Sequence, residues 1–165
     1  MTPRHQDPIV PGHTKILIPV GETASKDLIT QALHLLTAFK HPLIILFQVI
    51  EVPSRTSTLE LDPYRKEIKR AEENLTQLSK WLTEQGLEVR IKVAVARNAA
   101  EGIITETEMD GYMIVFLMKR RSAKGWRRIF NRSVSERVVR EANCLVMTAP
   151  LENPTRTSSS KTSKR

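Results

Sequence analysis

The sequence predicts an α/β protein with a parallel sheet that is covered by helices on both faces. Short apolar segments typical of buried strands alternate with amphipathic helical segments, in the order βαβαβαβαβ. Right-handed crossovers join parallel strands in such a chain, and each crossover places a helix on one face of the sheet. The 165 residues suffice for one domain with a substantial core, and we expect a single domain.

The first half of the chain is expected to form two strands and two helices, over residues 15–20 (strand), about 25–40 (helix), 43–52 (strand) and about 62–85 (helix). Apolar residues recur at helical spacing in the first helix, which ends before Pro42. Asp62 followed by Pro63 is typical of an N-cap and the first helical residue. Gly86 is expected to end this second helix.

The second half is expected to form three strands and two helices, over residues 89–95 (strand), 98–109 (helix), 112–118 (strand), 133–142 (helix) and 144–149 (strand). Asn98 with Glu101, and Ser133 with Glu136, have the spacing of a capping box, so each pair predicts a helix start. Pro150 is expected to close the last strand.

The domain is expected to span residues 14–150. Residues 1–13 contain three prolines and little apolar material, which predicts a flexible arm. Residues 151–165 show no apolar periodicity and are expected to be a disordered basic tail, rich in Ser and Thr.

The composition favours a cytoplasmic protein. Cys144 is the only cysteine, so the chain forms no internal disulfide, and it is more typical of a core residue than of a redox centre. No signal peptide is apparent, and the apolar runs are far shorter than the roughly 20 residues of a membrane span. The four histidines lie in separate segments, so no metal site is expected.

Most of the positive charge lies in one segment. Residues 119–132 contain seven Lys or Arg and no acid, in a chain whose net charge is +8. The segment lies between a strand and a helix, where exposed amides and the helix dipole favour an anion. We therefore consider a polyanion-binding loop, and as an alternative a solvated turn that only aids solubility. Trp126, Ile129 and Phe130 interrupt the charges, either as an interfacial amphipathic segment or, more simply, packed on the sheet.

KILIPV at residues 15–20, the capped helix after it and SVSERVVREANCLVMTA at 133–149 resemble the universal stress protein (UspA-like) family. The resemblance covers roughly residues 14–149. It implies a three-layer α/β/α domain of the adenine nucleotide alpha hydrolase-like fold, with a five-stranded parallel sheet in the order 3-2-1-4-5. It also implies a homodimer that forms through the fifth strand, residues 144–149.

Nucleotide-binding members of this family have an aspartate after the first strand and a G-x2-G-x9-G-[ST] motif before the last helix. Here the three glycine positions are Lys119, Ser122 and Arg132, the hydroxyl is retained as Ser133, and the aspartate position is Gly21. A Cβ at a glycine position introduces strain or keeps phosphate away from the backbone. Cationic side chains can still hold phosphate, because they need no special backbone conformation. The resemblance therefore implies no required cofactor, with ATP or ADP possible in a changed binding mode.

The candidate site lies where the first and fourth strands end. The positions that match the family's nucleotide contacts, with the adjacent Arg120, are Val20, Gly21, Val49, Lys119, Arg120, Ser122, Arg132, Ser133 and Val134. In a nucleotide complex, Lys119, Arg120 and Arg132 would neutralise phosphates, while Ser133 and the Val134 amide would lie at the helix end. Further candidates for an anionic partner are Arg121, Lys124, Arg127 and Arg128.

Three functions are considered. The first is a non-enzymatic, dimeric stress-response or regulatory module with a degenerate, strongly basic nucleotide loop. The second is an adaptor that has lost nucleotide binding and applies residues 119–132 to an acidic membrane surface, transporter or nucleic acid. The third is a weak ATP hydrolase whose turnover would need Ser133, although no catalytic triad, Cys/His pair or carboxylate pair can be assembled.

Overall fold

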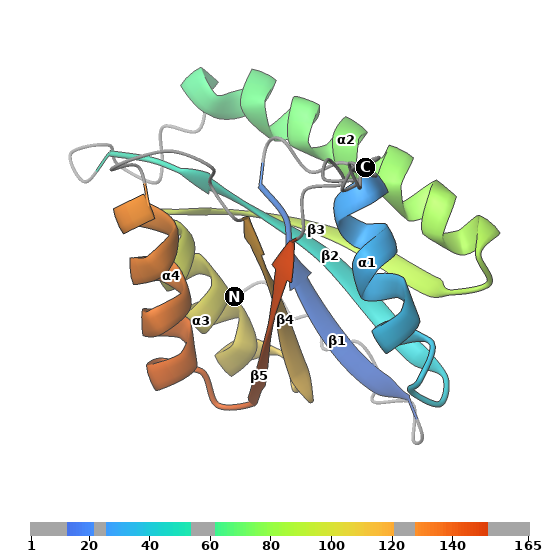
Figure 1. Ribbon diagram of the computed structural model, residues 1–165. Coiled ribbons are helices and arrows are strands. Elements are labelled where there is room, and N and C mark those ends of the chain that lie inside the picture. Colours follow the sequence, from blue (N-terminus) through green and yellow to red (C-terminus); the bar gives the residue numbers. More distant parts are fainter. Residues whose placement is uncertain (1–12, 22–25, 54–61, 121–127, 152–165) are drawn as a thin grey trace, which may run out of the picture.

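A five-stranded parallel sheet lies between two layers of helices in the computed structural model, which describes residues 13–21, 26–53, 62–120 and 128–151 (Figure 1). The strand order is β3-β2-β1-β4-β5, which confirms the predicted fold class. The elements are β1 (Thr14–Pro19), α1 (Lys26–Leu36), β2 (Pro42–Glu51), η1 (Asp62–Tyr64), α2 (Arg65–Glu84), β3 (Glu88–Ala96), α3 (Ala99–Met109), β4 (Ile114–Arg120), α4 (Arg128–Glu141) and β5 (Leu145–Leu151).

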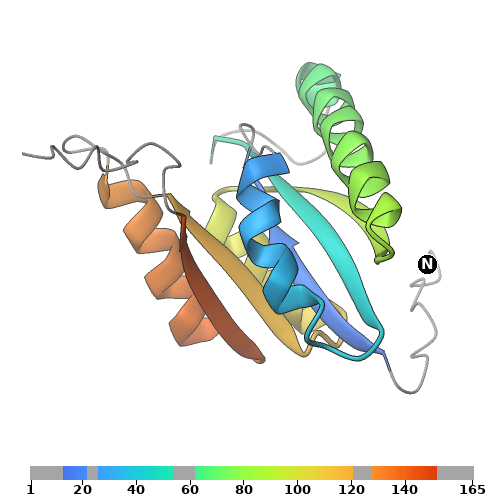
Figure 2. The same ribbon diagram turned by 45° about the vertical axis from the view of Figure 1, so that its right-hand side comes forward.

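Helices α1 and α2 cover one face of the sheet, and α3 and α4 cover the other (Figures 1 and 2). Each face has its own apolar core, because the buried strands present side chains alternately to both sides. The helical residues of the first core are Ile29, Ala32, Leu36, Ala71, Leu75, Leu78 and Leu82. Those of the second are Ala100, Ile103, Ile104 and Val138. None of the described helices is long and apolar enough to cross a bilayer.

The chain builds the sheet outward from β1 in two directions: β2 and β3 follow on one side of β1, and β4 and β5 on the other. Strand β1 pairs with β2 along its whole length, from Thr14 to Pro19. It pairs with β4 at two positions, where Ile16 and Leu17 meet Ile114 and Val115. The crevice beyond the carboxyl ends of β1 and β4 is therefore the topological switch point, where α/β sheets of this kind bind ligands.

The last two strands run further than their apolar segments predict. Strand β4 begins and ends two residues later than expected, and β5 continues past Pro150. The reason is their pairing, in which Lys119 lies opposite Pro150 and Arg120 opposite Leu151. A proline is tolerated there because β5 is an edge strand, with one side that needs no hydrogen-bonding partner in the sheet.

Helix α1 ends at Leu36, four residues before the predicted end. The amides of Ala38 and Phe39 then donate to carbonyls three residues earlier, at 3.2 and 3.3 Å, so the last turn is tighter than an α-helix. His41 follows with a positive φ of 47°, and β2 starts at the next residue. The short connection to β2 therefore ends the helix earlier than the apolar spacing suggests.

The start of α2 also differs from the prediction. Asp62 and Pro63 belong to the 3₁₀ turn η1, and the N-cap of the α-helix is Tyr64, which makes no side-chain capping bond. The end of α2 is as predicted: Gly86 has φ of 85° and its amide donates to the Thr83 carbonyl at 2.9 Å. A glycine adopts this left-handed conformation without steric cost, so it terminates the helix.

The predicted start of the last helix at Ser133 is wrong. Helix α4 begins at Arg128, so Ser133 lies inside the helix and is not its N-cap. The residues before Ser133 are Arg, Ile, Phe, Asn and Arg, and none of them is a proline or glycine that would prevent a helix from starting earlier. A capping-box spacing inside a helix-compatible stretch does not by itself set the boundary.

Candidate functional site

The carboxyl end of β1 supplies Val20 and Gly21. Val20 is buried in the first core, and its amide donates to the Phe47 carbonyl at 2.8 Å. Gly21 is exposed, and a Cβ built on it would meet no atom within 4 Å. This position has space for the acidic side chain of the family motif, but glycine has no side chain to place there.

Val49 lies on the opposite face from Val20, half-buried against the second core. Helix α3 approaches it so closely that a Cβ on Gly102 would lie 2.7 and 2.9 Å from the two Val49 methyl carbons. Val134 of α4 packs against the same core. The structure thus brings Val49 and Val134 to one face of the sheet and leaves Val20 on the other.

The other predicted site residues follow β4. The backbone of Lys119 and Arg120 ends this strand, and the backbone of Arg128, Arg132 and Ser133 belongs to α4. Four predicted residues lie outside the described part of the chain, namely Arg121, Ser122, Lys124 and Arg127.

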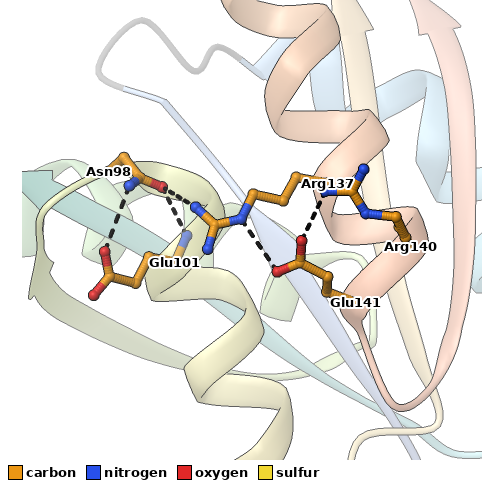
Figure 3. A network of polar contacts seen from close by, with 5 residues as sticks. All are labelled: Asn98, Glu101, Arg137, Arg140 and Glu141. Carbon is orange, nitrogen blue, oxygen red and sulfur yellow. Dashed lines mark hydrogen bonds and ion pairs between the residues drawn. The ribbon is translucent and has the colours of Figure 1, made fainter.

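The junction between β3 and α3 lies at the same edge of the sheet and is fully described (Figure 3). Asn98 is the N-cap of α3, and its Oδ1 accepts the Glu101 amide at 2.9 Å, as the capping box predicts. The Asn98 Nδ2 amide donates to the Glu101 carboxylate at 3.5 Å. The Ala99 amide donates to Oε1 of Glu51 at 2.7 Å. Groups of this chain therefore satisfy two of the first helical amides.

Arg137 of α4 extends to this junction (Figure 3). Its Nη1 donates to Asn98 Oδ1 at 3.4 Å, and its Nε donates to the Glu141 carboxylate at 3.2 Å. Arg140 donates to the other oxygen of Glu141 at 2.9 Å. Hydrogen bonds from Arg140 and Arg137 lower the pKa of Glu141, because both stabilise the ionised carboxylate.

A second polar cluster lies under α3, and the sequence analysis did not anticipate it. Glu106 is buried, and its Oε1 accepts hydrogen bonds from Lys92 Nζ at 2.7 Å and from the Tyr112 hydroxyl at 2.5 Å. Lys15 lies over the Tyr112 ring at 4.9 Å and forms a 2.5 Å ion pair with Asp110. The sequence did contain a signal for this cluster. Glu106 lies on the face of the helix that packs on the sheet, and a buried carboxylate needs polar partners.

A hollow of about 750 Å³ runs between α3 and the edge strand β3. Small residues on both sides create it, namely Ala94 and Ala96 on the strand and Gly102 on the helix. None of the predicted site residues is among the described residues that line it.

Cys144 precedes β5 at its amino end, away from the crevice, and packs partly against the second core. Burial raises the pKa of its thiol, against a smaller opposing effect from a backbone hydrogen bond with Val115. Cys144 therefore remains a thiol at neutral pH, and the thiol is less reactive than the thiolate. Within the described ranges, no three His, Cys, Asp or Glu side chains are grouped to hold a metal ion.

Comparison with known proteins agrees with this geometry. The model of the universal stress protein family matches residues 12–150. Protein MJ0577 is 25% identical in its solved structure, with 86% of this chain and 99% of that chain covered and a TM-score of 0.63. The universal stress protein UspA from Lactobacillus plantarum is 18% identical, with 82% and 96% covered and a TM-score of 0.60. A family protein from Arabidopsis thaliana with AMP bound is 16% identical, with 88% and 97% covered and a TM-score of 0.59. No curated protein matches closely enough to count as a relative.

The match to the family model covers more than four fifths of the chain, and the sheet order agrees with it. The chain belongs to the universal stress protein family.

Proposed function

We propose that this protein is a non-enzymatic regulatory module that binds an anionic group at the junction between β4 and α4 through cationic side chains. One observation carries the proposal. Residues 119–132, which connect the end of β4 to the first turns of α4, contain seven cations and no acid. Such a concentration of one sign of charge beside a helix start favours an anion more specifically than a high net charge does.

The comparison with the other helix start on this side of the sheet supports the proposal. At α3, Glu51 and Asn98 occupy the positions that an anion would take. No residue of 119–132 can supply a carboxylate in the same way at α4. The absence of a local acid favours an external anion at the start of α4.

Cationic side chains would replace the backbone mode of binding. The family's glycine positions are here Lys119, Ser122 and Arg132, so close approach of phosphate to the backbone is hindered. Lys119, Arg120 and Arg132 would neutralise phosphates from their side chains instead. The Arabidopsis relative with AMP bound makes an adenine nucleotide the first ligand to test. No cofactor is required for folding in this proposal.

Calorimetric titration with ATP, ADP and AMP at physiological ionic strength tests the nucleotide branch. Saturable binding that weakens as salt is added is expected, because side-chain contacts to phosphate are screened. Absence of saturable binding at millimolar nucleotide would reject nucleotide binding as the function of this site. An ATPase assay on the same samples is expected to show no turnover, and turnover that Ser133→Ala abolishes would contradict the non-enzymatic assignment.

A second candidate is an adaptor without nucleotide binding, which applies the basic segment to an acidic macromolecular surface. It is favoured by the charge distribution, because the chain outside residues 119–132 and 151–165 is close to neutral. This function predicts binding to anionic vesicles or nucleic acid that falls steeply with salt and that ATP does not affect. Reversal of Arg127 and Arg128 to Glu would remove it.

We also propose that the module is a homodimer through β5. This strand is an edge of the sheet, and Leu145 at its start is exposed to 67%. An unpaired apolar edge favours pairing with another chain. Sedimentation of the full chain and of a chain truncated after Leu151 tests this, since a dimer in both indicates pairing through the strand and not through the tail.

A further inference from the structure

Apolar packing holds α4 against the sheet. Val138 is fully buried in the second core, and Val134 packs partly against it. Val139 on the same helix is 56% exposed. Apolar contacts of this kind hold a helix on a surface but do not fix its rotation or its position along its axis, because they are not directional.

Arg137 supplies a directional contact to a neighbouring helix. Its Nη1 bonds to Asn98 Oδ1, the same oxygen that caps α3 through the Glu101 amide (Figure 3). Its Nε is held from the other side by Glu141, one helical turn later. A guanidinium held at two points has little freedom, so its position on α4 is tied to the start of α3.

Ser133 lies one turn before Arg137 on the same face of α4, because residues four apart in a helix are neighbours. The distance along the axis is about 6 Å at 1.5 Å per residue. Whatever fixes α4 at Arg137 therefore also acts on the backbone at the beginning of this helix.

We propose that Arg137 is a positioning residue, which holds the amino-terminal half of α4, and with it the anion site, in register with the capped start of α3. The inference rests on the proposed function, since it concerns the same site. Arg137 acts through Asn98 and not by contact with the anion. Its charge is already neutralised by Glu141, to which it donates.

The chain contains a matched control. Arg140 is next to Arg137 in the same helix turn, carries the same charge and also donates to Glu141, but no bond joins it to Asn98. Arg137→Gln and Arg140→Gln thus remove equal charge and one partner of the same carboxylate. Asn98→Ser provides a second route, because serine caps a helix about as well as asparagine but is too short to keep both contacts.

The first measurement uses inorganic pyrophosphate as the probe. Arg137→Gln and Asn98→Ser are each expected to weaken binding about fivefold, and the double variant no further, since either change alone already removes the contact between Arg137 and Asn98. Arg140→Gln is expected to change the affinity less than about twofold, as the loss of an exposed charge would. Equal effects of Arg137→Gln and Arg140→Gln, or additive effects in the double variant, would overturn the inference.

The second measurement needs no ligand. Amide hydrogen exchange of residues 129–134 is expected to be faster in Arg137→Gln than in Arg140→Gln or the unmodified chain. Unchanged exchange in Arg137→Gln overturns the positioning role even where anions bind. Faster exchange without any pyrophosphate binding to the unmodified chain leaves the positioning role in place and rejects the proposed function.

Discussion

Two strand-to-helix junctions at the carboxyl end of the sheet have the same capping-box spacing in sequence but fold differently. Asn98 with Glu101, before α3, and Ser133 with Glu136, in α4, both have the spacing of a capping box. The first pair caps a helix, and Glu51 completes it from β2. The second pair lies inside a helix that starts five residues earlier, within the segment 119–132 that has seven cations and no acid. Groups of the chain thus satisfy the first junction, and the proposed anion site lies at the second.

The largest expected effect comes from removing the charge difference between the junctions. Arg120→Glu with Arg132→Glu should weaken pyrophosphate or nucleotide binding about 100-fold, because two proposed charge-assisted contacts to phosphate become repulsive. The control is Lys66→Glu with Lys80→Glu, which changes the net charge equally on the exposed side of α2. Calorimetric titration measures both variants, and equal losses would mean that only the overall charge matters.

The next effect concerns the close packing that positions the capped junction. Gly102→Ala should reduce the free energy of unfolding by about 1–2 kcal/mol, because the new Cβ collides with the Val49 methyl groups. Urea denaturation measures the change. Combination with Val49→Ala should recover part of the loss, and no recovery would show that the strain lies elsewhere.

The third prediction contrasts the two signatures directly. Asn98→Ala should cost about 1 kcal/mol of stability, because the Glu101 amide loses its capping acceptor. Ser133→Ala should be neutral or slightly stabilising, because alanine is the better residue inside a helix. Thermal or urea unfolding compares them, and a similar loss for Ser133→Ala would restore the capping role that its spacing suggests.

The smallest effect is a pH dependence at the contact between α3 and α4. Hydrogen bonds from Arg140 and Arg137 lower the pKa of Glu141 in the folded protein, so the carboxylate binds its proton less readily there than in the unfolded chain. Its contribution is therefore fully present above the pKa of the carboxyl in the unfolded chain, and is lost as the pH falls through the lower pKa of the folded protein. The stability difference between the unmodified chain and Glu141→Gln should shrink over that acidic range. A difference that stays constant with pH would contradict this assignment.

The sequence predicted the order and type of every strand and α-helix, because each buried strand and amphipathic helix has a strong local pattern. It also located Gly86 and the Asn98 cap, which depend on neighbouring residues alone. Boundaries at β4, β5 and α4 were wrong, because strand pairing and the absence of a helix breaker extend these elements past the local signal.

The contacts of the candidate site were harder to predict than the fold. Glu51 bonds to a residue 48 positions later, and Arg137 to one 39 positions earlier, so no spacing rule connects them. The basic segment could be recognised from the sequence alone. Comparison of the sequence with the family motif also showed that its glycines and aspartate are replaced. Its position at the switch point follows from the sheet order, which the family resemblance implied and the structure confirms.

The most direct test is an amide chemical-shift titration of the ¹⁵N-labelled full chain with inorganic pyrophosphate. We expect saturable shifts for residues 119–134 at the junction of β4 and α4, with little change at the capped Ala99 and Glu101 amides. Saturable shifts centred on the start of α3, or none anywhere in the sequence, would contradict the claim that the β4–α4 junction is the anion site.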